Sequence, residues 1–269
     1  MSAPAISVTQ VRVTQRRVLT SEWIKLRSLR STVFTLVAAI GMTIGLGLLF
    51  SSFVVARWGS LTPAERAGID PTSFSLRGAF LAQLAVGVLG VLAITGEYST
   101  GMIRATLSAV PRRLPVLWAK LGVFTVVAAV TSIAASFVAF LGGQAIMSAK
   151  HVGVSLGAHD VLRVVIGTGL YLTVVGLLGM ALGFIIRNTA GAITALFGIL
   201  LILPVLGEVL PPDWAKDVVP YLPSNAGQAV TALHPDANSL APWTGFALFV
   251  GYVIIAVIGA AISLRRRDA

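Results

Sequence analysis

The chain has 269 residues, of which 56% are hydrophobic and only 11% charged, and its formal net charge is +10. Soluble domains carry roughly a quarter charged residues and a polar surface that grows with their core, so this composition excludes an ordinary soluble domain. The basic residues flank apolar blocks instead of gathering in one domain, which favours a membrane protein with no nucleic-acid partner.

The N-terminal segment, residues 1–32, is predicted to be a cytoplasmic tail followed by a basic amphipathic elbow helix over about residues 14–31. The apolar stripe of that helix consists of Leu19, Trp23 and Leu26 at helical spacing. A helix of this kind lies in the membrane interface, with its tryptophan at headgroup level. The expected interface residues are Trp23, Lys25, Arg27 and Arg30. This helix either docks a partner or only anchors and orients the chain.

Six apolar blocks are long enough to cross a bilayer, whose core takes about 20 residues of helix. They cover about residues 33–56, 78–96, 119–147, 163–186, 188–207 and 243–264. Only Arg187 and Asn188 separate the fourth block from the fifth, so a tight hairpin must join them. One continuous helix would be about 65 Å long, twice the core thickness. The predicted fold is an all-α membrane protein with one six-helix domain over residues 33–264 and a basic cytoplasmic tail over residues 265–269.

Small residues recur at helical spacing within these blocks and predict close packing of the helices, either within one subunit or against a partner. Two groups stand out, Gly41, Gly45 and Gly47 in the first block and Gly176, Gly179 and Gly183 in the fourth.

The distribution of charge predicts the orientation of the spans. With the N-terminus inside, 14 of the 20 basic residues lie in cytoplasmic segments, and seven of the ten acidic residues lie outside. Both asymmetries agree with the positive-inside rule, in which the basic residues carry the greater weight. We therefore expect a multi-pass protein of a bacterial plasma (inner) membrane with both termini in the cytoplasm.

Catalytic and metal-binding patterns are missing from the sequence. It contains no cysteine and no Gly-x-x-x-x-Gly-Lys-Ser/Thr phosphate loop. The three histidines lie between the blocks without metal-ligand spacing, His151 and His159 before the fourth block and His234 before the sixth. We therefore expect no cofactor, no metal site and no catalysis by this chain.

The apolar blocks also contain no charged residue when the third is counted from Leu121 and the fourth from Val164, which assigns Lys120 and Arg163 to the preceding loops. Carriers driven by protons or sodium ions usually place ionisable groups well inside a span. The energy for any transport is therefore expected to come from another subunit. The alternative is a secondary carrier that uses polar side chains in place of charges, with Gln83, Thr125, Gln144 and Tyr171 as candidates.

A second short helix is predicted across the cytoplasmic end of the bundle, within residues 95–113. Gly96 allows a break after the second span, Ser99 or Thr100 can cap a new helix, and Pro111 ends it. Its expected apolar side consists of Met102, Ile103, Thr106, Leu107 and Val110.

Glu97 is the only carboxylate in this segment and lies close to the end of an apolar span, where an ion is costly unless it is paired or hydrated. Arg104, two turns further on, is a candidate partner if the chain bends suitably. Glu97 is therefore either a structural cap or ion pair, or a residue with a functional role.

Residues 97–113, Glu-Tyr-Ser-Thr-Gly-Met-Ile-Arg followed by Ala-Thr-Leu-Ser-Ala-Val-Pro-Arg-Arg, resemble the segment after the second span in permease subunits of type-2 ATP-binding-cassette (ABC) exporters. Residues 21–31, Ser-Glu-Trp-Ile-Lys-Leu-Arg-Ser-Leu-Arg-Ser, are similar to the N-terminal elbow of that family in the form common among actinobacterial members. The resemblance extends to the layout of the whole chain, with a proline-rich outer segment between the fifth and sixth spans.

The resemblance implies that the helix after Glu97 is a coupling helix that seats in a separate cytoplasmic ATP-binding subunit. The implied coupling positions are Glu97, Tyr98, Thr100 and Arg104. It further implies a second permease copy, in a homodimer or a heterodimer, and outward movement of an unidentified substrate, for which an amphipathic molecule is one candidate. A non-transporting scaffold that docks a cytoplasmic protein through the same basic face is the remaining alternative.

Overall fold

The computed structural model describes residues 14–28, 30–109, 113–236 and 238–266, and all regular structure among them is helical. Six helical runs in these residues are long and apolar enough to cross a membrane. They are Val33–Ser60, Pro71–Ser99, Arg113–Lys150, Val161–Ile186, Thr189–Glu208 and Pro242–Arg266. This confirms the predicted all-α membrane fold and the number of its spans.

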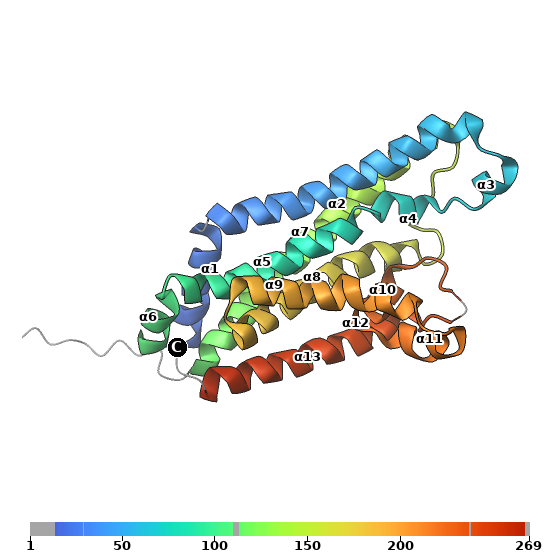
Figure 1. The fold of residues 1–269 in the computed structure, drawn as a ribbon. Helices are drawn as coiled ribbons and strands as arrows, with labels where there is room; N and C mark the ends of the chain where they lie inside the picture. Colours follow the sequence, from blue (N-terminus) through green and yellow to red (C-terminus); the bar gives the residue numbers. More distant parts are fainter. Residues whose placement is uncertain (1–13, 29, 110–112, 237, 267–269) are drawn as a thin grey trace, which may run out of the picture.

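The six spans form one elongated bundle with α2 and α13 at its two flanks (Figure 1). The helices that make up the spans are α2 (Arg30–Arg57), α5 (Ala79–Ser99), α7 (Arg113–Met147), α8 (Val161–Ile186), α9 (Thr189–Phe197) with α10 (Leu203–Glu208), and α13 (Pro242–Arg266). Helix α8 lies at the centre and packs against α5, α7 and α13. The flanking helices keep large apolar side chains on their outer faces, Phe34 on α2 and Ile255 on α13 among them, which suits a lipid environment.

Two short helices lie at the end of the bundle that we call the basal end, together with the last turn of α13 (Figure 1). They are α1 (Gln15–Ser28) and α6 (Met102–Ala109). The start of α7 holds this end together, because Gln15 Nε2 donates to the carbonyl of Pro115 at 3.2 Å and Arg113 donates to the carbonyl of Leu264 at 3.0 Å. Both ends of the described chain therefore lie on the same side of the bundle.

The opposite end, which we call the distal end, is built from short elements that connect the spans (Figure 1). They are η1 (Trp58–Ser60), α3 (Pro63–Ala67), α4 (Pro71–Leu76), η2 (Ser148–Lys150), α11 (Pro212–Val218), η4 (Val219–Tyr221), α12 (Pro223–Gln228) and η5 (Ala229–Thr231). Proline is the first residue of α3, α4, α11 and α12. This position tolerates proline because the first N–H groups of a helix have no acceptor within the helix.

Glycine permits the backbones of α5 and α8 to approach closely. A Cβ added at Gly90 would overlap the carbonyl of Gly176, and one added at Gly179 would overlap the carbonyl of Gly87. This confirms close packing for the glycines of the fourth block. In the first block only Gly47 makes such a contact, with the carbonyl of Ser75, whereas Gly41 and Gly45 border open space.

The hairpin between the fourth and fifth spans is as tight as the sequence predicts. Arg187 adopts a left-handed conformation with a φ of 60° and ends α8, and the side chain of Asn188 caps α9 by accepting from the N–H of Gly191 at 2.9 Å.

The fifth span is not a regular α-helix. Between α9 and α10 it passes through a π-helical segment, η3 (Gly198–Ile202), which lies just before Pro204. Proline cannot donate the helical hydrogen bond and its ring crowds the carbonyl four residues earlier, here that of Leu200. A widened turn at this point accommodates the ring.

Helix α5 differs from the prediction at its basal end. It passes through Gly96 without a break and reaches Ser99, so Ser99 lies in its last turn and Thr100 is its C-cap, and neither caps the next helix. The chain turns at Gly101, whose φ of 70° favours glycine, and α6 begins directly afterwards. Pro111, predicted to end this helix, lies outside the described residues.

Candidate functional site

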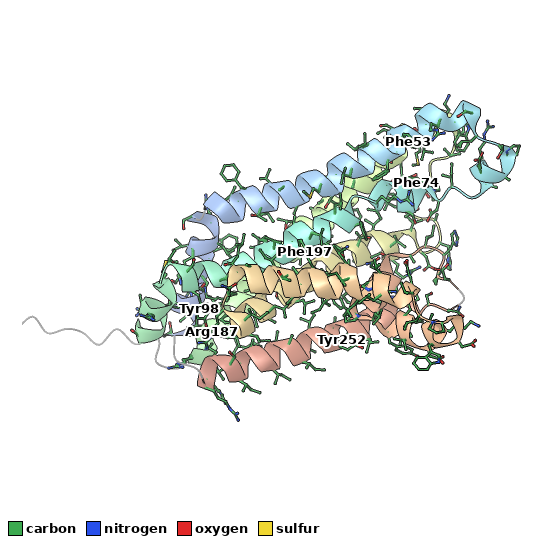
Figure 2. The ribbon with its side chains drawn as sticks, in the orientation of Figure 1. Phe53, Phe74, Tyr98, Arg187, Phe197 and Tyr252 are labelled. Carbon is green, nitrogen blue, oxygen red and sulfur yellow. The ribbon has the colours of Figure 1, made fainter. Side chains whose placement is uncertain are left out.

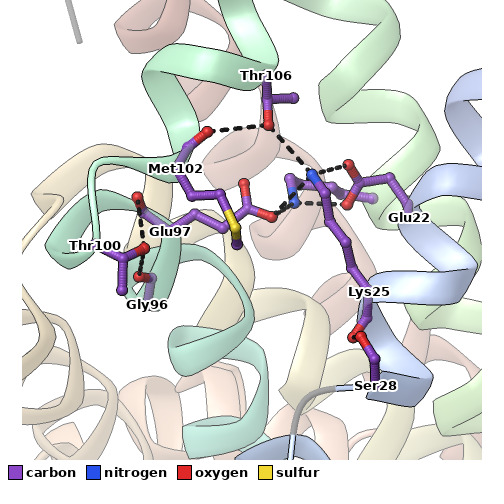
Figure 3. Close-up of polar contacts among 9 residues, drawn as sticks. Glu22, Lys25, Ser28, Gly96, Glu97, Thr100, Met102 and Thr106 are labelled. Atoms are coloured by element: carbon purple, nitrogen blue, oxygen red, sulfur yellow. Dashed lines mark hydrogen bonds and ion pairs between the residues drawn. The ribbon is translucent and has the colours of Figure 1, made fainter.

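Four charged side chains from three helices meet inside the basal end (Figure 3). We call them the charge cluster: Glu22 and Lys25 of α1, Glu97 of α5 and Lys120 of α7. Glu22, Glu97 and Lys120 are only 3–5% exposed. Charged residues are buried to this degree almost only when they are paired.

Both lysines of the charge cluster contact both glutamates. Lys120 Nζ lies 2.6 Å from Glu22 Oε2 and 2.5 Å from Glu97 Oε1. Lys25 Nζ lies 2.8 Å from Glu22 Oε1 and 3.2 Å from Glu97 Oε1. The two positive and two negative charges cancel. Loss of one member of such a buried group leaves an uncompensated charge and costs about 3–5 kcal/mol.

Local packing brings α1 to this position. Val18 and Glu22 are the buried residues of α1, one turn apart on the same face. Val18 packs against Val116 and Ala119 of α7, and Lys120 follows directly in sequence. An apolar contact therefore places Glu22 next to the lysine, and the ion pair supplies the partner that a buried carboxylate needs.

Helix α6 is attached to the charge cluster through Thr106 (Figure 3). Lys25 Nζ donates to Thr106 Oγ1 at 3.2 Å, and Thr106 Oγ1 in turn donates to the carbonyl of Met102 at 3.1 Å. Ile103, three residues before Thr106, is buried as well, whereas Met102 is exposed. The side chains of Leu107 and Val110 lie outside the described residues.

The environment of Lys25 favours its charged form. Burial alone would lower its pKa, but the hydrogen bond to Glu22 and the negative charges of Glu97 and Glu22 outweigh burial. The pKa of Lys25 is consequently raised above its ordinary value.

The four coupling positions implied by the resemblance divide into two groups. Glu97 is buried in the charge cluster and Tyr98 is half-buried, so both face the bundle. Thr100 and Arg104 are exposed, Thr100 just before α6 and Arg104 within it. Glu97 forms ion pairs with Lys25 and Lys120, whereas the spacing along the sequence suggests Arg104 as its partner.

A second polar junction lies beside the charge cluster, where the α8–α9 hairpin meets the end of α13. The guanidinium of Arg187 lies 5.2 Å from the ring centroid of Tyr98 (Figure 2). It also donates to the carbonyl of Ser263 at 2.9 Å, next to the Leu264 carbonyl that Arg113 holds. Positive side chains here satisfy carbonyls at the C-terminal end of α13 and complement its dipole.

The elbow residues predicted from the sequence have different environments. Trp23 is 48% exposed, with Leu19 beside it, as a helix facing an interface requires. Arg27 is exposed as well, but Lys25 turns inward to the charge cluster. Arg30 begins α2 instead of ending α1, and its side chain lies outside the described part of the chain.

Sequence reasoning missed Lys120 and Glu22. Lys120 does not belong to a loop: it lies in α7, 5% exposed, so the third span is not free of buried charge. The available signal was the isolation of a single lysine between Ala119 and Leu121, because a lone ion among apolar residues needs a partner of opposite charge. That signal does not identify which carboxylate is the partner of Lys120.

The polar residues considered for a carrier are not one group. Gln144 is a structural link, donating to the carbonyl of Pro71 and to Ser75 Oγ and accepting from the N–H of Val154. Thr125 donates to its own helix, at the carbonyl of Leu121, and has no other hydrogen bond among the described residues. Gln83 and Tyr171, by contrast, form a buried hydrogen-bonded pair.

The described residues contain no group of three histidine, cysteine or carboxylate side chains suited to a metal ion. No family model matches the chain, and no curated protein is similar to it in sequence. The function must therefore be inferred from the residues of this chain.

Proposed function

We propose that the chain is the membrane-spanning permease subunit of an ABC exporter. Two copies, in a homodimer or a heterodimer, move a substrate outward, and a separate cytoplasmic ATPase binds α6. The observation that carries this proposal is the attachment of α6. Its outer side, with Arg104, is exposed, while Thr106 on its inner side is hydrogen-bonded to Lys25 of the charge cluster.

This attachment connects α6 to three helices of the bundle, α1, α5 and α7. Lys25 belongs to α1, and its partners Glu22 and Glu97 connect through Lys120 to α7 and α5. Buried and mutually paired charges have little freedom to rearrange singly, because each separation is costly. A displacement of α6 by a partner would therefore move the basal ends of α1, α5 and α7 together. In this scheme Thr100 and Arg104 contact the ATPase, while Glu97 and Tyr98 are positioning residues.

The placement of the buried charges supports an energy source outside the chain. Glu97 lies in the last turn of α5, and Lys120 lies within the first three turns of α7. They are paired with each other, so neither is an isolated ion-binding group in mid-span of the kind that ion-driven carriers use.

We place the basal end in the cytoplasm of a bacterium whose plasma membrane the six spans cross, because most of the basic residues gather there. The absence of cysteine from the sequence permits a direct test with Ser108→Cys in α6 and Ser60→Cys in η1, both at exposed positions. A membrane-impermeant maleimide applied to intact spheroplasts should label only the cysteine at residue 60. Labelling of residue 108 in intact cells would reverse the orientation.

The test of the function is copurification from native membranes followed by an ATP hydrolysis assay. We expect an ATPase to accompany the tagged chain and Arg104→Glu to release it. Arg27→Glu is the matched control, because Arg27 is an exposed arginine at the same end but on α1. If no ATPase accompanies the chain, it is not a permease of this class. If both variants release the ATPase equally, α6 is not its docking element.

A secondary carrier is the second candidate, and the buried Gln83–Tyr171 pair is the observation that favours it. Transport by the purified chain alone in proteoliposomes, driven by a proton or sodium gradient, would establish the carrier in place of the permease.

A further inference from the structure

Two adjoining cavities occupy the distal half of the bundle, away from the charge cluster. The outer cavity has a volume of about 880 Å³ and lies among the fifth span, α11, η4 and α12. The inner chamber has a volume of about 160 Å³ and lies among α4, α5, α8 and α12. Phe80, Gln228 and Thr231 line both, so the two adjoin at these side chains. The outer cavity alone is within the size range of small-molecule sites, which is about 300–1,000 Å³.

The inner chamber has an unmet requirement for a hydrogen-bond acceptor. Gln83 lines it and is 0% exposed. Tyr171 Oη donates to Gln83 Oε1 at 2.5 Å and accepts from Gln228 Nε2 at 3.4 Å. The first of these hydrogen bonds uses the oxygen of the Gln83 amide and leaves its nitrogen available as a donor. Gln83 Nε2 has no hydrogen-bond partner among the described residues. A buried donor without a partner costs about 1–3 kcal/mol.

Arg77 lines the same chamber and adds a positive charge. Its guanidinium lies 4.6 Å from the ring centroid of Phe74 and 5.8 Å from that of Phe50. The two rings, which do not themselves line the chamber, stack with the guanidinium of Arg77, an exposed residue of its lining. The flat guanidinium matches a carboxylate. Both features of the chamber call for an acceptor-rich, anionic group.

The outer cavity is suited to an apolar chain. Its wall along η3 and the start of α10 is apolar, and the π-helical segment before Pro204 contributes to it. The apolar residues on this wall are Leu200, Leu201, Pro204 and Val205. The charged residues of the lining lie outside this apolar wall. They are Glu208 at the end of α10, Lys216 on α11 and Asp236 in the loop after η5.

We propose that these two cavities form a binding site for an amphipathic monocarboxylate, with the carboxylate in the inner chamber at Gln83 and Arg77 and the apolar chain in the outer cavity along Leu200 to Val205. Water alone would satisfy Gln83, but it would leave the apolar wall of the outer cavity without a matching occupant. Binding of this kind does not depend on transport, so it can be measured on the purified chain without an ATPase.

The experiment uses the full chain in lipid nanodiscs and dodecanoic acid that carries a photoreactive diazirine on its chain. Cross-linked residues are mapped by mass spectrometry, and unlabelled dodecanoic acid and dodecylamine compete in parallel. We expect saturable labelling of the η3–α10 segment that the acid displaces and the amine does not. Labelling that neither competitor reduces would mean that only lipid or water occupies the cavities, and it would overturn the proposal.

Two variants of Gln83 test the recognition of the head group. Gln83→Leu removes the donor, and we expect about tenfold weaker competition by the acid. Gln83→Glu keeps the acceptor for Tyr171 and adds a negative charge, so competition should shift from the acid to the amine. Thr125→Val is the control, since Thr125, among the described residues, bonds only to its own helix and lines neither cavity. Unchanged acid selectivity in folded Gln83→Glu would refute the assignment of the head group.

A third variant separates the outer cavity from the inner chamber. Ala232 lines the outer cavity only, and Ala232→Trp should fill part of it and abolish saturable labelling while Gln83 stays intact. The unfolding temperature shows whether each variant is folded. Full labelling in folded Ala232→Trp would exclude the outer cavity as the site of the apolar chain.

Discussion

Lys120 Nζ lies 2.6 Å from Glu22 Oε2, although 98 positions separate the two residues in the sequence. The contact joins the helix before the first span to the third span, with both side chains 5% exposed. Helix α1 is therefore more than an anchor on the membrane surface, because Glu22 and Lys25 supply two of the four charges of the charge cluster.

The first prediction concerns the cost of removing Lys120. In Lys120→Met two buried glutamates share a single lysine, and we expect the free energy of unfolding to fall by about 3–5 kcal/mol. Thermal unfolding in detergent, followed by tryptophan fluorescence, measures the change. Lys150→Met is the control, because Lys150 is exposed in η2 and should have little effect.

The double variant Glu22→Gln/Lys120→Met tests whether the two residues act as a pair. It removes one charge of each sign and keeps the cluster neutral, so it should be more stable than Lys120→Met alone. If the effects of Glu22→Gln and Lys120→Met simply add, the two side chains are not coupled and the pairing is wrong.

The second prediction concerns the link between α6 and the charge cluster. Thr106→Val removes the acceptor of Lys25 while keeping the shape of the side chain. A hydrogen bond to a charged group contributes about 1.5–3 kcal/mol, so amide hydrogens of α6 should exchange with solvent at least about tenfold faster. Hydrogen-exchange mass spectrometry measures this, with exposed Ser108→Ala as the control. Equal exchange in both variants would show that Thr106 does not hold α6.

The elements that the sequence predicts well are those with local causes. Each span is one apolar run, and the hairpin at Arg187 and Asn188 follows from span length and capping. The charge cluster has no local cause beyond the spacing of Glu22 and Lys25 on one helix. Its other pairs join different helices, so a search by spacing finds Arg104 and misses Lys120.

The π-helical segment and the cavities were missed for a related reason. Pro204 signals a disturbance of the fifth span, but whether the helix kinks, breaks or widens depends on the helices around it. The Gln83–Tyr171 pair likewise joins two spans 88 positions apart. Polar residues inside apolar blocks could be identified from the sequence, whereas their partners could not.

The third prediction compares two glycines of α5. Gly90→Ala places a methyl group on the carbonyl of Gly176 and should destabilise the bundle by about 1–3 kcal/mol, since α5 and α8 must separate. Gly96→Ala meets no atom within 4 Å and should leave the stability unchanged or raise it by about 0.5–1 kcal/mol, because alanine favours helix. Unfolding temperatures measure both changes. A larger loss at Gly96 than at Gly90 would contradict the packing described here.

The last prediction is an alkaline loss of stability through Lys25. Because the cluster raises the pKa of Lys25, its contribution is complete below the unfolded value of about 10.4 and is lost as the pH rises through the higher folded value. Its charged neighbours are Glu22 and Glu97, which Lys120 also contacts. The difference in unfolding temperature between the native chain and Lys25→Met should therefore stay constant from about pH 7 to about pH 10 and shrink above that range. A difference that shrinks on acidification towards about pH 6 would assign the effect to a carboxylate instead.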